Sequence, residues 1–294
     1  MSETQGQDHH NVIRDHRRQW HDFLYVYPVV ARRSKGLSVG INLNPDKRCT
    51  YSCVYCQVDR KIARNLHSVD LEVLRRELRA VLHEAAEGTI WQHPRFSAVP
   101  LPLRRINDIA FSGDGEPTCM ANFDQAVAAA AEVKRQLDLA DVKLVVITNA
   151  TAFDGEPFRR ALPILEANNG EIWAKLDAGT EAYFLRINRP GPGLTLDKVV
   201  SNITEVAKGC PLVIQTLFLS LAGDPPPLRE VTAYCERLKG ILRAGGQIKL
   251  VQIHTVARTP ADARAGSLDD AALEALAAVV RQAIPAVPVE VFHG

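Results

Sequence analysis

The sequence predicts an α/β fold built on a parallel sheet. Short β-branched runs alternate along the chain with amphipathic stretches of helical length, and the strand comes first in each repeat. Alternation of this kind produces parallel strands joined by right-handed crossovers. The repeats are too few for a closed eight-unit barrel, so the residue pattern leaves either a partial barrel or an open doubly wound sheet.

The strands are predicted where β-branched and aliphatic residues cluster between polar turns. In chain order they are Leu37 to Leu43, Asp108 to Ser112, Lys143 to Thr148, Ile172 to Asp177, Leu212 to Leu219, Gln247 to His254, and a short last one at Val287 to Phe292.

The helices are predicted from apolar residues that recur on one face. The first of them carries Leu71, Leu74, Leu78, Val81, Leu82 and Ala85 on that face. In chain order the helices are Val69 to Glu87, Phe123 to Leu137, Glu156 to Ala167, Leu196 to Lys208, Leu228 to Arg243 and Asp269 to Ala283.

No segment rich in Gly, Ser or Pro divides the chain, so we predict one core domain over residues 27–294 after a polar tail over residues 1–26. The tail lacks the apolar core of a secretory signal and the acid-poor character of a transit peptide. The longest apolar stretches are strand-length, well short of the ~20 residues that cross a bilayer. We therefore expect a cytoplasmic protein without a membrane partner.

The charge of the chain is nearly balanced. Lys plus Arg number 35 and Asp plus Glu number 34, which leaves a formal net charge of +1. Sequence-blind binding of nucleic acid is not indicated by such a balance, and no DNA partner is expected.

Three cysteines, Cys49, Cys53 and Cys56, lie close together without a fourth nearby. A cubane iron–sulfur cluster has four irons, so three thiolates hold three of them and leave one iron open to another ligand. The alternative is a zinc knuckle, which normally closes four ligands as two spaced pairs. His67 lacks the spacing to be the fourth ligand, so the cluster is favoured.

Two further motifs follow predicted strands. Ser112 to Thr118 contains Gly113, Gly115 and Glu116 after the second strand, and Thr148 and Asn149 end the third. Glycine lets the backbone approach a ligand that a Cβ atom would hold away. Ordinary turn and helix-cap chemistry is the alternative explanation for Glu116.

These motifs resemble those of the radical S-adenosylmethionine (SAM) superfamily. The spacing Cys49-x3-Cys53-x2-Cys56, with Tyr55 before the last cysteine, is similar to the signature loop of that superfamily, and Gly115-Glu116-Pro117 is similar to its second-strand motif. The closer resemblance is to the wyosine-base synthase-like subgroup. The residues that carry it are Ala31-Arg32-Arg33-Ser34-Lys35-Gly36-Leu37-Ser38, Gly113-Asp114-Gly115-Glu116-Pro117-Thr118 and Arg186-Ile187-Asn188-Arg189-Pro190.

The resemblance implies a partial (β/α)6 TIM-like barrel with a [4Fe-4S] cluster on the three cysteines. The free iron would bind S-adenosylmethionine, and reductive cleavage would release a 5′-deoxyadenosyl radical that abstracts hydrogen from a substrate. A reductant such as flavodoxin or ferredoxin would supply the electron. By the same resemblance Tyr55 would lie against the adenine, Gly115 and Glu116 would meet the methionine amino group, and Thr148 and Asn149 would approach the polar end of the cofactor.

Strand alternation adds Lys175 and Asp177 to the candidate cofactor-binding residues. On the fourth strand they share one face, opposite Ile172, Ala174 and Leu176, and a charge in a barrel interior must be paired or bound to a ligand. A purely structural ion pair is the alternative. The same reasoning nominates three residues of later strands as interior candidates: Gln215, Gln252 and His254.

The substrate is left open by the sequence. A tRNA base is the first candidate, and a small molecule or peptide is the next. An iron–sulfur electron carrier or redox sensor that binds the cofactor without cleaving it is the alternative function, and a zinc-stabilised loop is a third. No cysteine precedes Cys49, whereas the wyosine synthases carry a second cluster on earlier cysteines; Cys119, Cys210 and Cys235 occur singly, as small core residues would.

Two more segments could select the substrate. Arg32, Arg33 and Lys35 are able to grip a phosphate but fit a solvated loop equally well. The segment from Gly88 to Arg105 is predicted as an irregular surface loop.

Overall fold

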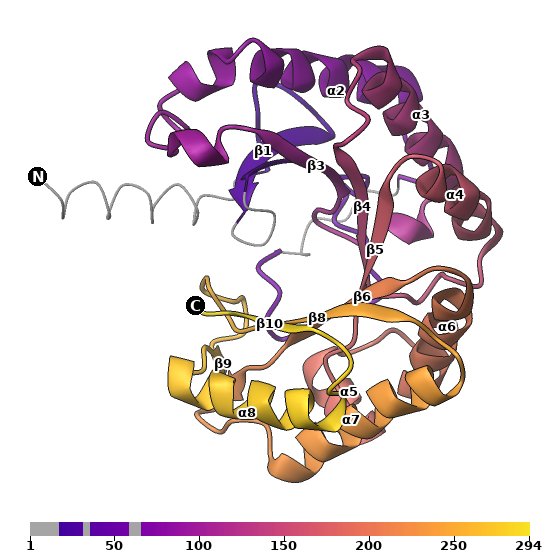
Figure 1. Ribbon diagram of the computed structural model, residues 1–294, viewed down its shortest axis with the longest axis vertical. Helices are drawn as coiled ribbons and strands as arrows, with labels where there is room; N and C mark the ends of the chain where they lie inside the picture. Colours follow the sequence, from indigo (N-terminus) through magenta and orange to yellow (C-terminus); the bar gives the residue numbers. More distant parts are fainter. Residues whose placement is uncertain (1–17, 32–35, 59–65) are drawn as a thin grey trace, which may run out of the picture. The chain divides into compact units, whose positions relative to one another are not determined.

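The computed structural model describes residues 18–31, 36–58 and 66–294. Contacts between residues divide the chain into two compact units. The first comprises Met1–Arg48, Ala63–Val146 and Glu156–Glu171, and the second comprises Cys49–Ile62, Ile147–Gly155 and Ile172–Gly294. Strands and helices alternate in both, so the predicted α/β class is confirmed (Figure 1).

In the part of the chain that the structure describes, the first unit is built on four strands in chain order. They are β1 Val26–Ala31, β2 Gly36–Ile41, β3 Ile106–Phe111 and β4 Lys143–Thr148, the last of which enters the second unit after Val146. β2, β3 and β4 are parallel, whereas β1 pairs antiparallel with β2, with Val26 opposite Ile41. β1 was not predicted, because it is an antiparallel neighbour of β2 and lies outside the repeated strand–helix pattern.

Among the described residues, the helices of the first unit are α2 Leu71–Ala86, α3 Phe123–Gln136 and α4 Glu156–Glu166. Asp70 caps α2, because its side chain accepts hydrogen bonds from the backbone N–H groups of Glu72 and Val73. Five of the six residues of the predicted apolar face are buried: Leu74, Leu78, Val81, Leu82 and Ala85. The helical periodicity therefore located both the helix and its core-facing side.

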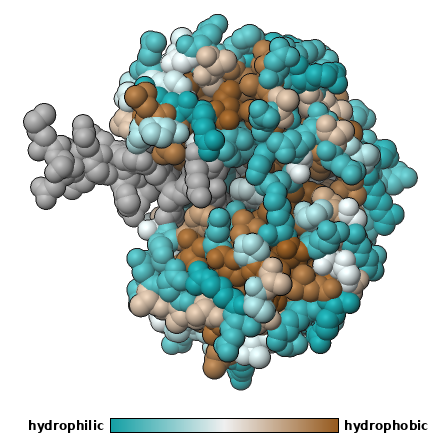
Figure 2. Space-filling model, in the orientation of Figure 1, coloured by the Kyte–Doolittle hydropathy of each residue, from teal (hydrophilic) through white to brown (hydrophobic). Residues whose placement is uncertain are grey.

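The second unit repeats the strand–helix pattern. Its strands are β5 Gly170–Lys175, which enters the unit at Ile172, β6 Leu212–Leu217, β8 Ile248–His254 and β10 Val289–Phe292, and they pair in parallel in that order. Its helices are α5 Glu181–Ile187, α6 Leu196–Gly209, α7 Leu228–Arg243 and α8 Asp270–Ala283. α5 and the small antiparallel pair β7 Ser220–Leu221 and β9 Ala265–Gly266 were not predicted, since each is too short to show a period. On the face drawn in Figure 2, hydrophilic residues predominate along the edge of the view, and hydrophobic residues gather in patches between them.

The segment from Gly88 to Arg105 is irregular, as predicted, but it is also packed against the first unit through several buried apolar residues. It forms two short 3-10 turns, η1 Thr89–Gln92 and η2 Leu101–Leu103, and Ile90, Phe96 and Val99 are at most 2% exposed. Its widely spaced apolar residues pack in the core, but they follow neither a helical nor a strand period and were therefore not predicted to do so.

The described end of the predicted tail is also packed. Trp20 is 5% exposed and Tyr25 is 3% exposed, and the Trp20 ring lies 5.6 Å from the Phe96 ring. Apolar burial therefore begins before residue 26. His9, His10 and His16 in the tail, and Arg32, Arg33 and Lys35 before β2, lie outside the described residues.

Among the helices of the described residues, none combines the length and the apolar character needed to span a membrane.

Candidate functional site

The cysteine loop belongs to the second unit, where backbone hydrogen bonds join it to the end of α5. Val54 N–H donates to the Ile187 carbonyl at 2.9 Å, and Ser52 N–H reaches the carbonyls of Asn188 and Arg189 at 3.2 and 3.0 Å. Further along, Gly191 N–H donates to the carbonyl of Thr50 at 2.8 Å. The segment Arg186 to Pro190, which carries part of the resemblance to the wyosine-base synthase-like subgroup, thus supports the cysteine loop.

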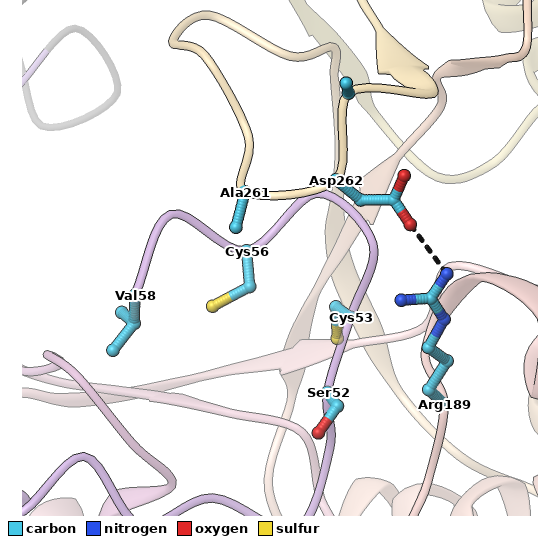
Figure 3. Close-up of a pocket in the computed structure, with 8 residues that line it drawn as sticks. Ser52, Cys53, Cys56, Val58, Arg189, Ala261 and Asp262 are labelled. Atoms are coloured by element: carbon cyan, nitrogen blue, oxygen red, sulfur yellow. Dashed lines mark hydrogen bonds and ion pairs between the residues drawn. The ribbon is translucent and has the colours of Figure 1, made fainter. Parts of the chain in front are cut away.

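A pocket of about 460 Å³ opens beside this loop (Figure 3). Its lining includes the side chains of Cys53 and Cys56, and an ion pair between Arg189 and Asp262 at 2.7 Å forms part of its wall (Figure 3). The backbone N–H of Ala261 donates to the carbonyl of Cys56 at 3.1 Å, which attaches the wall to the loop. Hydrogen bonds from Arg264 and Arg189 hold the pKa of the Asp262 carboxyl well below its usual range, so this wall keeps its charge in mild acid.

A buried polar network lies next to Cys53. Asp177, with a side chain only 1% exposed, accepts hydrogen bonds from the Tyr55 hydroxyl, from Asn188 Nδ2 at 2.9 Å and from Leu217 N–H at 2.9 Å. Lys175 Nζ lies 3.4 Å from the same carboxylate and 5.1 Å from the centre of the Tyr55 ring. The network attaches the cysteine loop to the ends of β5 and β6.

This network bears on the roles predicted for Lys175 and Asp177. The two side chains form the ion pair that was the structural alternative, and they lie together as strand alternation predicted. Both oxygens of Asp177 are already engaged by protein donors, which favours a supporting role for it, whereas Lys175 is 19% exposed. Contact of either residue with a cofactor stays a prediction.

Burial is the main cause of the pKa shifts of Cys53 and Tyr55. Surrounding protein atoms desolvate the charged form of its thiol and raise its pKa to about 12, against a smaller lowering by the Tyr55 hydroxyl. Burial, together with the nearby charge of Asp177, also holds the pKa of Tyr55 well above its usual range. The Tyr55 hydroxyl therefore stays protonated and able to donate.

Thr148 and Asn149 shape the turn after β4 and reach the cysteine loop. Thr148 Oγ1 accepts the N–H of Ala150 at 3.0 Å, and Asn149 Oδ1 accepts the N–H of Thr151 at 3.1 Å. The Asn149 amide donates to Thr50 Oγ1 at 2.7 Å and lies 3.8 Å from Cys49 Sγ. The structure thus brings Asn149 to a cysteine and turns Thr148 to the backbone, and contact of either residue with a cofactor stays a prediction.

Gly115 and Glu116 belong to the first unit. A Cβ atom built at Gly115 would lie 1.8 Å from the carbonyl oxygen of Arg48, and Glu116 N–H donates to that same oxygen at 3.1 Å. The Glu116 carboxylate accepts the N–H and hydroxyl of Thr118 at 3.2 and 2.6 Å, so the cap chemistry weighed as an alternative is present. Glycine is needed here because the turn packs on the residue that precedes Cys49.

The interior candidates of the later strands are also located. Gln215 and Gln252 are buried and hydrogen-bonded to each other at 2.9 Å, and His254 ends β8. The three remaining cysteines lie on different elements. Cys119 is exposed at the end of η3 Pro117–Cys119, Cys210 follows α6, and Cys235 is buried within α7.

The second unit offers the groups that an iron–sulfur cluster and a polar organic cofactor need. None of the three signature cysteines is in a disulfide, all are partly exposed, and a cubane takes each thiolate on a different iron. In the part of the chain that the structure describes, no three His, Cys, Asp or Glu side chains meet closely enough for a single metal ion. The buried Oδ1 atom of Asn188 accepts no hydrogen bond from the described residues.

Comparison with known proteins decides the family. The sequence model described as the Radical SAM superfamily matches residues 43–219, more than half of the chain. The chain belongs to the radical SAM superfamily. The match includes the cysteine loop and the motifs at the ends of β3 and β4, and it therefore covers parts of both units.

Curated relatives of this radical SAM chain share part of their length with it. A protein named GTPase Obg from Brachyspira hyodysenteriae is 27% identical over 84% of this chain and 32% of that protein. A UPF0026 protein from Methanocaldococcus jannaschii is 32% identical over 60% of this chain and 47% of that protein. This chain spans between 32% and 58% of the lengths of the curated relatives described for it.

Solved radical SAM structures share the fold. SuiB of Streptococcus suis bound to S-adenosylmethionine matches with a TM-score of 0.57 and 13% identity, over 90% of this chain and 52% of that one. TYW1 with a lysine–pyruvate adduct bound matches with a TM-score of 0.52 and 14% identity, over 85% of this chain and 74% of that one. At such identities the likeness concerns the fold, and it confirms the prediction of a partial barrel.

Sequence reasoning missed three residues of the site: Asn188, Arg189 and Asp262. Asn188 and Arg189 belong to the segment Arg186 to Pro190, which carries part of the family resemblance but was assigned no role in the site. Asp262 lies far along the chain in an irregular segment. Arg189 has a φ of 46°, in the left-handed region, and this unusual backbone conformation is visible in the structure but not in the sequence.

Proposed function

We propose that this protein is a radical SAM enzyme in which Cys49, Cys53 and Cys56 hold a [4Fe-4S] cluster. The observation that carries the proposal is the pocket onto which Cys53 and Cys56 open, next to a buried polar network. When bound, the cluster and S-adenosylmethionine supply a 5′-deoxyadenosyl radical for hydrogen abstraction. The protein binds and orients them and limits the access of water.

The residues of the second unit divide this work. The three thiols hold the cluster, and Tyr55, fixed by Asp177, offers its ring as a surface for the adenine. Lys175 offers a partly exposed cation for a carboxylate. Asn149 supports the loop through Thr50.

For Gly115 and Glu116 the proposed role rests on the resemblance of their turn. Its backbone fits the resemblance to the second-strand motif, whose role is to meet the methionine amino group. Because the Glu116 N–H is occupied by the Arg48 carbonyl, we infer that carbonyl groups of the turn are the ones offered to that amino group.

A tRNA base is the first substrate candidate, and a small molecule or peptide is the next. The resemblance to the wyosine-base synthase-like subgroup supports the tRNA candidate, while a nearly neutral net charge of +1 means that a local basic surface would have to hold the RNA. We propose a cytoplasmic setting and a flavodoxin or ferredoxin as the electron donor, with neither membrane nor DNA involved.

Anaerobic reconstitution tests the proposal. The wild-type protein should bind about four irons and, once reduced, release 5′-deoxyadenosine from S-adenosylmethionine. Cys53→Ala should lose both the iron and the cleavage, because two thiolates do not hold a cubane. Cys210→Ser, a cysteine at the end of α6 outside the pocket lining, is the matched control and should retain both.

Three outcomes would overturn parts of the proposal. Stoichiometric zinc without iron would support a zinc-stabilised loop. A cluster without cleavage would support an electron carrier or redox sensor. Cleavage by Cys53→Ala at the wild-type rate would show that the ligand assignment is wrong.

A further inference from the structure

Asn188 places a side-chain amide against a cysteine of the proposed cluster. It follows the last residue of α5 and is 2% exposed. Its Nδ2 atom lies 3.6 Å from Cys53 Sγ, 3.2 Å from the Tyr55 hydroxyl oxygen and 2.9 Å from Asp177 Oδ2. Its backbone is anchored as well, since the N–H donates to the Phe184 carbonyl and the carbonyl accepts from Ser52.

The surroundings determine which end of the amide faces Cys53. Asp177 is a carboxylate and only accepts hydrogen bonds, so the nearby atom of Asn188 must be the nitrogen. One amide hydrogen is taken by Asp177, and the second is directed toward Cys53 Sγ and the Tyr55 oxygen. A thiolate on iron is a charged acceptor and draws the second hydrogen more strongly than a neutral phenol does.

We propose that Asn188 is a positioning residue for the cluster, whose amide donates a hydrogen bond to the Cys53 sulfur and raises the reduction potential of the cluster. The proposal rests on the proposed function, because it requires iron on Cys53. Reduction adds negative charge to the cluster and its sulfurs, so a donor aimed at a ligand sulfur stabilises the reduced state more than the oxidised one.

Asp177 fixes the orientation of the Asn188 amide toward Cys53. Leu217 N–H and the Tyr55 hydroxyl hold the carboxylate in place, and the carboxylate in turn fixes the amide of Asn188. Asn149 also lies near a cysteine, at a longer distance. Asn149 Nδ2 lies 3.8 Å from Cys49 Sγ, but it also donates to Thr50 Oγ1 at the shorter distance of 2.7 Å.

A redox titration of the reconstituted cluster without S-adenosylmethionine tests the proposal. Asn188→Leu keeps the size of the side chain and removes the donor, so its midpoint potential should fall. We expect the ratio of reduced to oxidised cluster at a fixed potential to drop by about three- to tenfold, where tenfold corresponds to about 59 mV for one electron. Asn202→Leu is the matched control: it is buried in the same unit, bonds the carbonyls of Ala150 and Thr151, and should leave the potential unchanged.

A second measurement does not depend on how the variant folds. Wild-type protein labelled with [15N]asparagine should show a weak 15N coupling to the reduced cluster in pulsed electron paramagnetic resonance. Asn202→Leu, labelled in the same way, should retain that coupling.

The results separate this inference from the proposed function. If the wild-type protein binds no iron, the proposed function fails. If it binds iron and cleaves the cofactor, the inference alone is overturned by an unchanged potential in Asn188→Leu, by an equal shift in Asn202→Leu, or by the absence of the 15N coupling.

Discussion

At the scale of single residues, buried carboxylates organise this protein. Glu77, Asp177 and Glu230 are each at most 4% exposed, and each accepts several hydrogen bonds from backbone N–H groups or side chains. A buried charge is stable only when donors surround it in this way. Each carboxylate therefore fixes a loop or strand end, and Asp177 does so at the candidate site.

Gly115→Ala should destabilise the protein because a Cβ atom would lie 1.8 Å from the Arg48 carbonyl oxygen, a backbone atom that cannot simply move aside. We expect a loss of about 1 to 3 kcal/mol in the free energy of unfolding, measured by denaturant titration, together with a lower iron content after reconstitution. Gly240→Ala in α7 is the control, since no atom lies within 4 Å of its Cβ position. It should be neutral or slightly stabilising, and equal losses in both variants would contradict the close-packing argument.

At the scale of elements, periodicity located the long strands and helices well. β4 was predicted with its observed bounds, and α7 likewise, because their patterns are long and local. β1 was not predicted, because it pairs antiparallel with β2 and contains Pro28. Proline is found mainly in edge strands, and β1 is the terminal strand of the first unit. Its identity depends on pairing, and pairing is not visible in a local pattern.

Glu77→Ala should loosen the entry into β1. The Glu77 carboxylate accepts the N–H groups of Leu24, Tyr25 and Val26 at 2.8, 2.8 and 3.2 Å, and its loss would leave buried donors without partners. We expect a fall of about 2 to 4 kcal/mol in the free energy of unfolding and faster hydrogen exchange of those three amides.

The control for this prediction is Glu72→Ala on the same helix. Its side chain is 85% exposed and forms only a surface ion pair with Arg75, so less than about 1 kcal/mol is expected. Unchanged exchange at Leu24 to Val26 in Glu77→Ala would show that the carboxylate does not hold β1.

At the scale of the whole molecule, membership of the radical SAM superfamily predicts how a reaction begins and leaves its target open. The cysteine loop and the β3 and β4 motifs lie in the matched region, whereas Asp262 lies outside it. Since substrate choice is a property of the surfaces around the pocket, it does not follow from the shared motifs.

The tRNA proposal predicts a change in modified nucleosides. Digested tRNA from cells lacking the gene should lose or accumulate one nucleoside compared with the parent strain, as measured by mass spectrometry. Restoring the wild-type gene should reverse the change, and a gene encoding Cys53→Ala should not. An identical nucleoside profile in all strains would contradict the tRNA proposal and favour a small molecule or peptide as the substrate.

The sequence by itself determined the α/β class, most strand and helix positions and the three cysteines of the candidate cluster, because periodicity and ligand spacing are local properties of a chain. Only the tertiary structure decided that Tyr55, Asp177 and Asn188 meet beside Cys53, and that Gly115 packs on Arg48. These contacts join residues far apart in sequence. They depend on how strands pair and where loops return, which no local pattern specifies.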